Sequence, residues 1–458
     1  MRALPVLAVA LLVCSAVVGA TGGLAGVGAP DVTTDPDSDA IRPVGDSVVT
    51  QADGDVPQQI NVLDIPPTSV ERWAVDRQYV DLGPALALST NQTTHQLQTL
   101  SMVEEVEATE TDAEREARLE AALTTLEAEV DELDQRQTDA VAAYGRGEIT
   151  SRDLLVTLVR ISITAEELNE RRGRIDRFAA GTRGVDIDRG RLASISNQLS
   201  AFTGPVRAHA ESVLRGEVPP HRFYLATGPQ SVTVSTVVDD TYIREAYRGD
   251  LRNGVGDAIE LEVALDIVSE SYPVIWNTTR EQTQVFGGGE TYPVRVVHGR
   301  GDLTAFVDSN ARVVYAEHQR RPLSSFTAER RADRTAEGLR LRVNHTYPGG
   351  PVEVRVVDSV TGDPVDANVS MSIETGPQRT LGTTGGDGVL WTLSPYRSYT
   401  ISADGRNGSV DATVEPGSPP RVKPTTTDSG DGNESAENES AGNETATATP
   451  TPTITPIP

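Results

Sequence analysis

The side chains best able to bind a transition metal are six histidines and one cysteine, and their spacing decides what chemistry they can do. The histidines are His95, His209, His221, His298, His318 and His345. No two of them have the short paired spacing of a zinc site, and the single cysteine, Cys14, offers no thiolate pair. We therefore interpret each histidine as a hydrogen-bonded or solvated side chain, and we expect no metal and no cofactor.

Motifs for nucleophilic catalysis and phosphate binding are also missing from the sequence. There is no G-x-S-x-G motif to expose a serine nucleophile. The glycine clusters FGGGE, NGVGD and TTGGDG lack the lysine and helix start of a phosphate-binding loop, so we interpret them as turns. Carboxylates are so numerous that a pair of them carries no weight as a glycosidase signal. We predict no catalytic residue and expect a protein that is not an enzyme.

Two further motifs have both a functional and a structural interpretation. Four aspartates in expected turns could supply oxygen ligands to calcium, although aspartate is also an ordinary turn residue. They are Asp358, Asp363, Asp366 and Asp387. Residues 300–302 spell the adhesion tripeptide Arg-Gly-Asp, although Gly-Asp is itself common in turns. We favour the turn interpretation in both cases.

Eight Asn-x-Ser/Thr sequons are possible N-glycosylation sites, which would place them on the surface of an exported protein. They are Asn91, Asn277, Asn344, Asn368, Asn407, Asn433, Asn438 and Asn443. Chance accounts for a few sequons in a threonine-rich chain, but three within ten or so residues of the tail are harder to dismiss.

The composition is strongly acidic and poor in aromatic residues. The net charge of −27 is spread along the chain, aromatic residues make up 4%, and Lys423 is the only lysine. Many carboxylates with arginine in place of lysine resemble the proteins of extreme halophiles, where concentrated salt screens charge repulsion. An acidic protein from a GC-rich genome is the alternative. This charge argues against a nucleic-acid partner, which needs a basic surface.

The first 29 residues have the pattern of a signal peptide. Arg2 precedes an apolar run from Leu4 to Val18, and small residues follow at the expected cleavage site. An uncleaved anchor is the alternative, but the run is shorter than the ~20 residues that span a membrane. We predict an extracellular or cell-surface protein. No apolar helix follows the tail, so we predict no C-terminal membrane anchor.

Hydrophobic spacing predicts two long helices in the first half of the chain. Apolar positions from Leu119 to Tyr144 and from Leu154 to Ala179 alternate by four and three, which is a heptad pattern. Gln137 and Arg172 interrupt the two series. Glycines separate the helices, and Thr150 with Asp153 resembles a capping box for the second one. We predict an antiparallel helical hairpin, with a helical dimer as the alternative.

The second half of the chain has the alternating pattern of strands. SVTVSTVV at 231–238 and three segments between 292 and 318 predict strands, and 257–270 predicts a helix. From Gly338 onward, short strands and turns predict a β-sandwich. The fold class is therefore multi-domain α+β: a heptad helical hairpin, a small α+β module, a C-terminal β-sandwich and a disordered tail rich in Thr and Pro.

The predicted boundaries follow from these patterns. We expect a signal peptide at 1–29, a disordered acidic lead-in at 30–58, a helical hairpin domain at 59–216, an α+β module at 217–325, a linker at 326–337, a β-sandwich at 338–415, and a disordered, glycosylated tail at 416–458.

Three resemblances extend this interpretation. VEVRVVDSVTGDPVDANVSM, TTGGDGVLWTL and YRSYTISADG, within 351–403, resemble the transthyretin-like sandwich of carboxypeptidase regulatory domains, an accessory module without catalytic residues. YPVRVVHGRGDLTAFVDSNARVVYAEH is similar to small exported peptidase-inhibitory domains. The order of segments resembles exported multi-domain proteins of halophilic archaea, which implies a compartment and no activity.

We therefore predict a non-enzymatic cell-envelope or secreted protein that acts in spacing, adhesion or partner binding. The partner would be an envelope or extracellular protein or polymer. A regulator of an exported peptidase is the first alternative, and an unrecognised hydrolase is the second.

Overall fold

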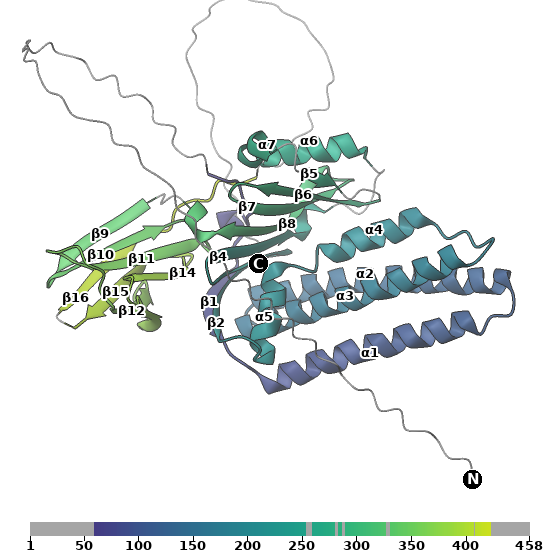
Figure 1. Cartoon of the computed structure of the whole chain (residues 1–458), viewed down its shortest axis with the longest axis horizontal. Helices are drawn as coiled ribbons and strands as arrows, with labels where there is room; N and C mark the ends of the chain where they lie inside the picture. Colours follow the sequence, from purple (N-terminus) through teal and green to yellow (C-terminus); the bar gives the residue numbers. More distant parts are fainter. Residues whose placement is uncertain are drawn as a thin grey trace, which may run out of the picture. The chain divides into compact units, whose positions relative to one another are not determined.

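The computed structural model describes residues 59–252, 259–279, 283–285, 289–326, 330–406 and 408–422 (Figure 1). The chain divides into two compact units, 1–56 and 57–458, and every described residue belongs to the second. The predicted signal peptide, the acidic lead-in and residues 423–458 of the predicted tail lie outside the described residues.

The two helices predicted from heptad spacing are α2 (Asp112–Gly145) and α3 (Ser151–Gly181), which pack against each other across a five-residue turn (Figure 1). Each begins with a capping box: Thr111 with Glu114, and Thr150 with Asp153. These boxes satisfy backbone N–H groups that a helix start leaves without partners. The capping box predicted at Thr150 is therefore confirmed.

The two polar interruptions of the heptads have different outcomes. Gln137 is buried, and its Oε1 accepts a hydrogen bond of 2.7 Å from the buried Arg207. After Gln137 the buried series continues through Val141 and Tyr144. In α3, by contrast, Arg171 is the buried arginine, whereas Arg172 is half-buried and bonds Asn169 on its own helix. The prediction that Arg172 lies in the packed series is wrong by one position.

Three further helices complete the helical region: α1 (Leu82–Glu107), α4 (Arg189–Ser200) and α5 (Pro205–Arg215). The long helix α1 was not predicted from the sequence. It packs against α2, α3 and α5, mainly through Leu88, Thr99 and Val106. The start of α5 is held by Glu245 of the sheet, whose Oε1 accepts from the backbone N–H groups of Val206 and Arg207.

The central element is an antiparallel sheet of eight strands in the order β1-β2-β3-β4-β8-β7-β6-β5. The strands are β1 (Arg72–Gln78), β2 (His221–Gly228), β3 (Ser231–Val238), β4 (Thr241–Arg248), β5 (Thr283–Val285), β6 (Thr291–His298), β7 (Gly301–Asp308) and β8 (Val313–Pro322). The predicted strands at 231–238 and between 292 and 318 are present. β1 lies within residues 59–216, which were expected to form the helical hairpin domain. It belongs to the sheet instead, because it pairs with β2 along its whole length.

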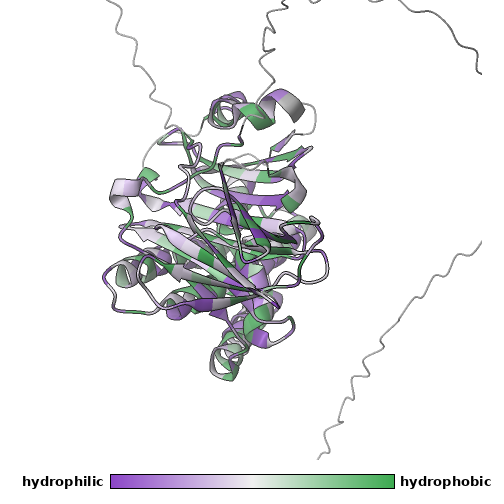
Figure 2. Ribbon diagram, turned by 90° about the vertical axis from the view of Figure 1, so that its left-hand side faces the viewer, coloured by the Kyte–Doolittle hydropathy of each residue, from purple (hydrophilic) through white to green (hydrophobic). Residues whose placement is uncertain are grey.

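The helical region and the sheet share one hydrophobic core. Leucines of α2 and α3 join Phe223, Leu225, Ile243 and Tyr247 on one face of the sheet. The helices α6 (Leu261–Ser271) and α7 (Pro273–Thr279) pack with Ala246 and Val294 in a second core. Figure 2 shows hydrophobic and hydrophilic residues interleaved along these strands and helices. The helices therefore cover the sheet rather than forming a separately packed domain.

The C-terminal sandwich consists of two four-stranded sheets, in the orders β14-β11-β10-β9 and β13-β12-β15-β16. Its strands are β9 (Arg330–Ala336), β10 (Leu339–His345), β11 (Pro351–Asp358), β12 (Asn368–Ile373), β13 (Arg379–Thr383), β14 (Val389–Leu393), β15 (Tyr399–Gly405) and β16 (Gly408–Val414). The predicted linker at 326–337 is wrong, because β9 lies within it and pairs with β10 from Arg330 to Ala336. Four charged residues hid this strand, because Arg330, Arg331, Asp333 and Arg334 fall on both of its faces and leave no alternation of apolar and polar positions.

The sandwich contacts the sheet through a buried polar junction. The carbonyl of Gly349 accepts hydrogen bonds from Ser235 Oγ (2.6 Å) and Tyr242 Oη (2.9 Å). Leu393 of the sandwich packs with Tyr224 of the sheet. Because a buried carbonyl without donors costs free energy, this junction favours one fixed docking of the sandwich.

Candidate functional site

A cleft of about 700 Å³ lies where the eight-stranded sheet meets the sandwich. Its walls include residues 73–77 of β1 and residues 379–382 of β13. Both strands are edge strands of their sheets. Successive residues of a strand point to opposite faces of its sheet. Because five successive residues of β1 line the cleft, the cleft runs along the open edge of β1 and not over one face.

Three arginines, Arg77, Arg222 and Arg379, give this cleft its charge, and we call it the arginine cleft. Asp76 is the one carboxylate in its lining, and it pairs with Arg379 at 3.2 Å and accepts a hydrogen bond from Ser151. Arg222 donates to the carbonyls of Thr380 (2.8 Å) and Leu381 (3.2 Å), so no carboxylate offsets its charge there. The cleft is thus a positive site on a chain of net charge −27.

The arginines of the cleft lie close enough together to lower the pKa of one of them, Arg222. Partial burial lowers the pKa of Arg222, and the nearby cations Arg77 and Arg379 lower it further. Arg77 stacks over the Tyr79 ring at 5.8 Å and forms no ion pair among the described residues. A guanidinium placed in this way can form charge-assisted hydrogen bonds with a carboxylate or a phosphate.

The rest of the arginine cleft is apolar. Trp73, Met371, Ile373 and Leu381 line it. The Trp73 ring lies 6.2 Å from that of Tyr396, which donates a hydrogen bond to the carbonyl of Pro67. An apolar lining with a few convergent polar groups, at a junction of domains, is typical of ligand sites of this volume.

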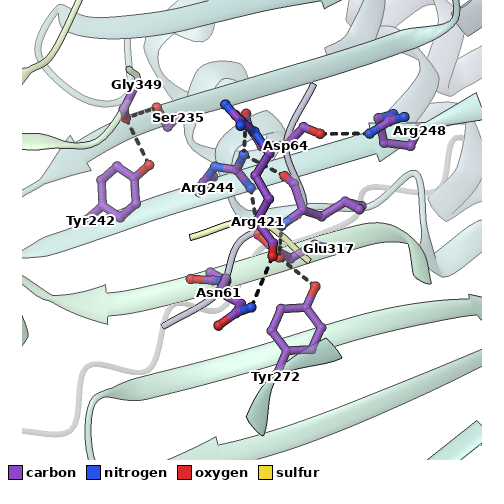
Figure 3. Close-up of polar contacts among 12 residues, drawn as sticks. Asn61, Asp64, Ser235, Tyr242, Arg244, Arg248, Tyr272, Glu317, Gly349 and Arg421 are labelled. Carbon is purple, nitrogen blue, oxygen red and sulfur yellow. Dashed lines mark hydrogen bonds and ion pairs between the residues drawn. The ribbon is translucent and has the colours of Figure 1, made fainter. Parts of the chain in front are cut away.

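A second polar cluster lies under the sheet, and its contacts are all internal (Figure 3). Arg244 pairs with Glu317 at 2.7 Å, and the other oxygen of Glu317 accepts from Tyr272 and from the backbone N–H of Leu63, both at 2.7 Å. Burial raises the pKa of Glu317, and Arg244 opposes that shift. Both charges are buried and paired, so loss of either partner would leave an uncompensated buried charge, and we interpret this cluster as structural.

The same cluster holds the two ends of the described chain together. Val62 and Arg421 form a parallel bridge, with hydrogen bonds from Val62 N to the Pro420 carbonyl and from Val422 N to the Val62 carbonyl. Asp64 pairs with both Arg244 (3.3 Å) and Arg421 (3.5 Å). Residues almost 360 positions apart in the sequence are therefore neighbours, as Figure 3 shows.

The histidines do not gather into a metal centre among the described residues, where no group of three or more potential metal-binding side chains occurs. The structure does bring together His209 and His221, whose rings lie 4.5 Å apart edge to face. Burial, reinforced by His221, lowers the pKa of His209 to about 4. Their twelve-residue separation gave no sign of this pair in the sequence.

The four aspartates considered for calcium have ordinary turn contacts. Asp358 accepts from the backbone N–H groups of Val360 and Thr361, Asp366 accepts from Gly385, and Asp387 accepts from Val389. The carbonyl of Asp363 accepts from the backbone N–H of Asp358. These contacts favour the turn interpretation.

The Arg-Gly-Asp tripeptide at 300–302 also has a structural explanation. Gly301 begins β7 with φ of 132°, and a Cβ atom there would lie 2.0 Å from the carbonyl oxygen of Arg320. Only glycine fits such a close backbone approach. The glycine is therefore required by the close approach of β8 at the start of β7.

The sequons differ in how accessible their asparagines are. Asn91 lies within α1 and donates to Thr164 Oγ1 at 2.8 Å, and Asn344 lies within β10 and donates to Glu353 at 2.7 Å. Asn277 and Asn368 are exposed, on α7 and at the start of β12. Asn407, Asn433, Asn438 and Asn443 lie outside the described residues. Glycosylation at Asn277 or Asn368 would thus leave the fold intact, whereas at Asn91 it would break a contact between helices.

The sequence analysis did not identify the arginine cleft. Its arginines are separated by 145 and 157 positions, and only the fold brings β1, β2 and β13 together. The one local signal was the alternation of Trp73, Val75, Arg77 and Tyr79, which is the period of a strand.

Comparison with known families divides the chain into three consecutive segments. Residues 1–218 match a model described as a domain of unknown function (DUF7096), and residues 223–327 match a family of unknown function (DUF7094). Residues 330–412 match the archaeal fibronectin-III type-like domain. No curated protein and no solved structure matches the chain. The third match begins where β9 begins, which agrees with a sandwich that includes the predicted linker.

The fibronectin-III type-like match supports an archaeal origin and points to an extracellular or surface protein. The resemblance of residues 351–403 to a transthyretin-like domain agrees with this match at the level of a two-sheet β-sandwich. Within the part of the chain that the structure describes, no helix has both the length and the hydropathy needed to cross a membrane.

Proposed function

We propose that this chain is a non-enzymatic binding protein of the archaeal cell surface and that the arginine cleft is its ligand site. The observation that carries the proposal is the cleft itself, where three arginines face one carboxylate on a chain of net charge −27. A basic, partly apolar cleft on an acidic surface selects an anionic partner.

An extended, acidic segment of another protein fits the arginine cleft best. The open edge of β1 offers backbone groups that can pair with an added strand. Arg77 on β1 and Arg379 on the facing β13 line the cleft and can bind carboxylates on the added strand. The apolar residues Trp73 and Leu381 can accept alternate side chains, because successive residues of a strand point in opposite directions. This is the partner-binding role predicted from the sequence, with a site assigned to it.

A direct test uses the full chain and a capped octapeptide of alternating Glu and Thr, with a Gln-Thr peptide as the uncharged control. Calorimetry should detect binding of the Glu peptide and weaker binding of the Gln peptide. Arg77→Gln should weaken the Glu peptide about tenfold or more, because a charge-assisted hydrogen bond contributes roughly 1.5–3 kcal/mol. A peptide methylated on alternate backbone nitrogens should also lose affinity.

Arg136→Gln is the matched control, because Arg136 lies on α2, away from the cleft, and its ion pair among the described residues is with Glu132. This variant should bind the Glu peptide as the unmodified chain does. Equal affinity for the Glu and Gln peptides, or equal losses in the two arginine variants, would contradict the proposal.

A further inference from the structure

Helix α1 has a long uncharged surface that faces away from the rest of the chain. No Asp, Glu, Lys or Arg occurs between Leu82 and Val103, in a chain of which 23% is charged. Among the described residues, six of the nine exposed large hydrophobic side chains lie between Tyr79 and Leu100. Four of them are leucines that are 56–75% exposed: Leu82, Leu86, Leu97 and Leu100.

The spacing of this surface is that of a helix-pairing seam. Leu86, Thr90, Thr93, Leu97 and Leu100 alternate by four and three, and all five are exposed. This is the heptad pattern by which one helix packs against another. Within the chain, α2 and α3 use the same pattern for their mutual packing, but no described element covers the outer seam of α1.

The inward side of α1 is, by contrast, largely polar. Asn91 donates to Thr164 at 2.8 Å, Gln92 donates to Glu167 at 3.0 Å, and Thr99 accepts from Arg171 at 3.2 Å. Beside the buried Leu88 and Val106, the helix therefore turns hydrogen-bonding groups inward, and it leaves four leucines exposed where a surface helix usually carries polar residues. Packing within one chain does not account for the outer leucines.

We propose that the outer seam of α1 pairs with the same seam of a second copy of this chain, forming a two-fold symmetric dimer. Charge selects this occupant. Two chains of net charge −27 repel each other, and the seam between Leu82 and Val103 lets them meet without opposing carboxylates. A two-fold dimer joins one surface patch to itself, and an uncharged row of leucines is self-complementary.

The two copies of α1 run antiparallel. Glu104, Glu105 and Glu107 gather at the C-terminal end of the helix, so parallel copies would place these acids together. Antiparallel copies instead separate them and place each set near the partner's helix N-terminus, where the backbone dipole favours negative charge and Arg152 pairs with the N-cap Asp81. With Thr93 on the two-fold axis, Leu86 of one copy lies opposite Leu100 of the other, since both are seven residues from Thr93.

Sedimentation of the full chain in concentrated KCl tests this inference. The unmodified chain should sediment as a dimer at tens of micromolar, and Leu97→Glu combined with Leu100→Glu should raise the dissociation constant by at least about tenfold. Val360→Glu is the control, because Val360 is even more exposed than Leu97 and Leu100 but lies in the sandwich, and this variant should remain dimeric. Circular dichroism should show the same fold for all three chains.

Orientation is tested by disulfide formation in a Cys14→Ser background. A mixture of Leu86→Cys and Leu100→Cys chains should cross-link, and Leu97→Cys alone should not. A monomeric unmodified chain would overturn the proposal, and so would a dimer that survives both Glu substitutions. A monomer that floats with lipid vesicles through the same leucines would assign the seam to a membrane surface instead.

Discussion

Glu317 is a fully buried carboxylate. One of its oxygens pairs with Arg244, and the other accepts hydrogen bonds from Tyr272 and from the backbone N–H of Leu63 in the N-terminal segment. Replacing it with Gln removes the closer and fully buried of the two carboxylates that pair with Arg244, and leaves that buried cation with Asp64 at 3.3 Å. We expect Glu317→Gln to lower the free energy of unfolding by roughly 3–5 kcal/mol, the usual cost of breaking a buried ion pair.

Chemical denaturation in high salt measures this cost. Glu132→Gln removes one partner of an exposed pair with Arg136 and should change the free energy of unfolding by less than about 1 kcal/mol. Equal, small losses in both variants would show that Arg244 is not held by Glu317 in solution.

Gln137 shows at the same scale what the sequence could not specify. It interrupts the heptad of α2, and the sequence left open a register mark, an oligomeric contact or a solvated break. In the structure it accepts from Arg207, which also donates to Glu245 at 3.0 Å. A polar residue at an apolar position was visible in the sequence, but Arg207, which donates to it, lies 70 positions away, and Glu245, which holds that arginine, lies 108 positions away.

At the scale of elements, the packing of α2 against α3 can be tested at single positions. Leu126 and Leu158 are both fully buried in the predicted series. Truncating either one to Ala should cost roughly 2–5 kcal/mol, through lost burial and an unfilled cavity. Thermal or urea unfolding measures this change.

The best control for this test is Asp131→Ala, which should cost less than about 0.5 kcal/mol because Asp131 is exposed. Glu127, although next to Leu126 in sequence, is a poorer control, because it accepts two hydrogen bonds from Arg191. Similar losses for Leu126→Ala and Asp131→Ala would mean that the heptad interpretation is wrong.

Helices and strands with a regular apolar spacing in their own sequence were predictable. Those that form only through contacts with residues distant in the sequence were not. α2 and α3 repeat an apolar series for about thirty residues each, so the sequence predicted them. β9 is rich in charged residues and has no apolar alternation of its own, and its strand character depends on pairing with β10. α1 was missed because leucines lie on its exposed side and because its packed side mixes Leu88 and Val106 with polar residues, so no single apolar series marks the inward face.

At the scale of the whole molecule, charge should set the conditions under which the chain folds. Sixty-seven acidic residues face forty basic ones, and repulsion among exposed carboxylates is screened only when salt shortens the Debye length to ~3 Å. We expect circular dichroism to show loss of structure as KCl is lowered from about 4 M to 0.1 M. An unchanged folded signal over that range would contradict the halophilic interpretation.

The parallel bridge between Val62 and Arg421 has a mechanical consequence. A pull applied between residues 59 and 422 draws the two parallel chain segments in opposite directions along their length. It therefore shears the bridge and does not separate its hydrogen bonds one after another. Both backbone hydrogen bonds and the contacts of Asp64 with Arg244 and Arg421 must then yield together. Tension applied to the two ends therefore acts first on this bridge and its ion pairs, before it acts on the sheet, the helices or the sandwich.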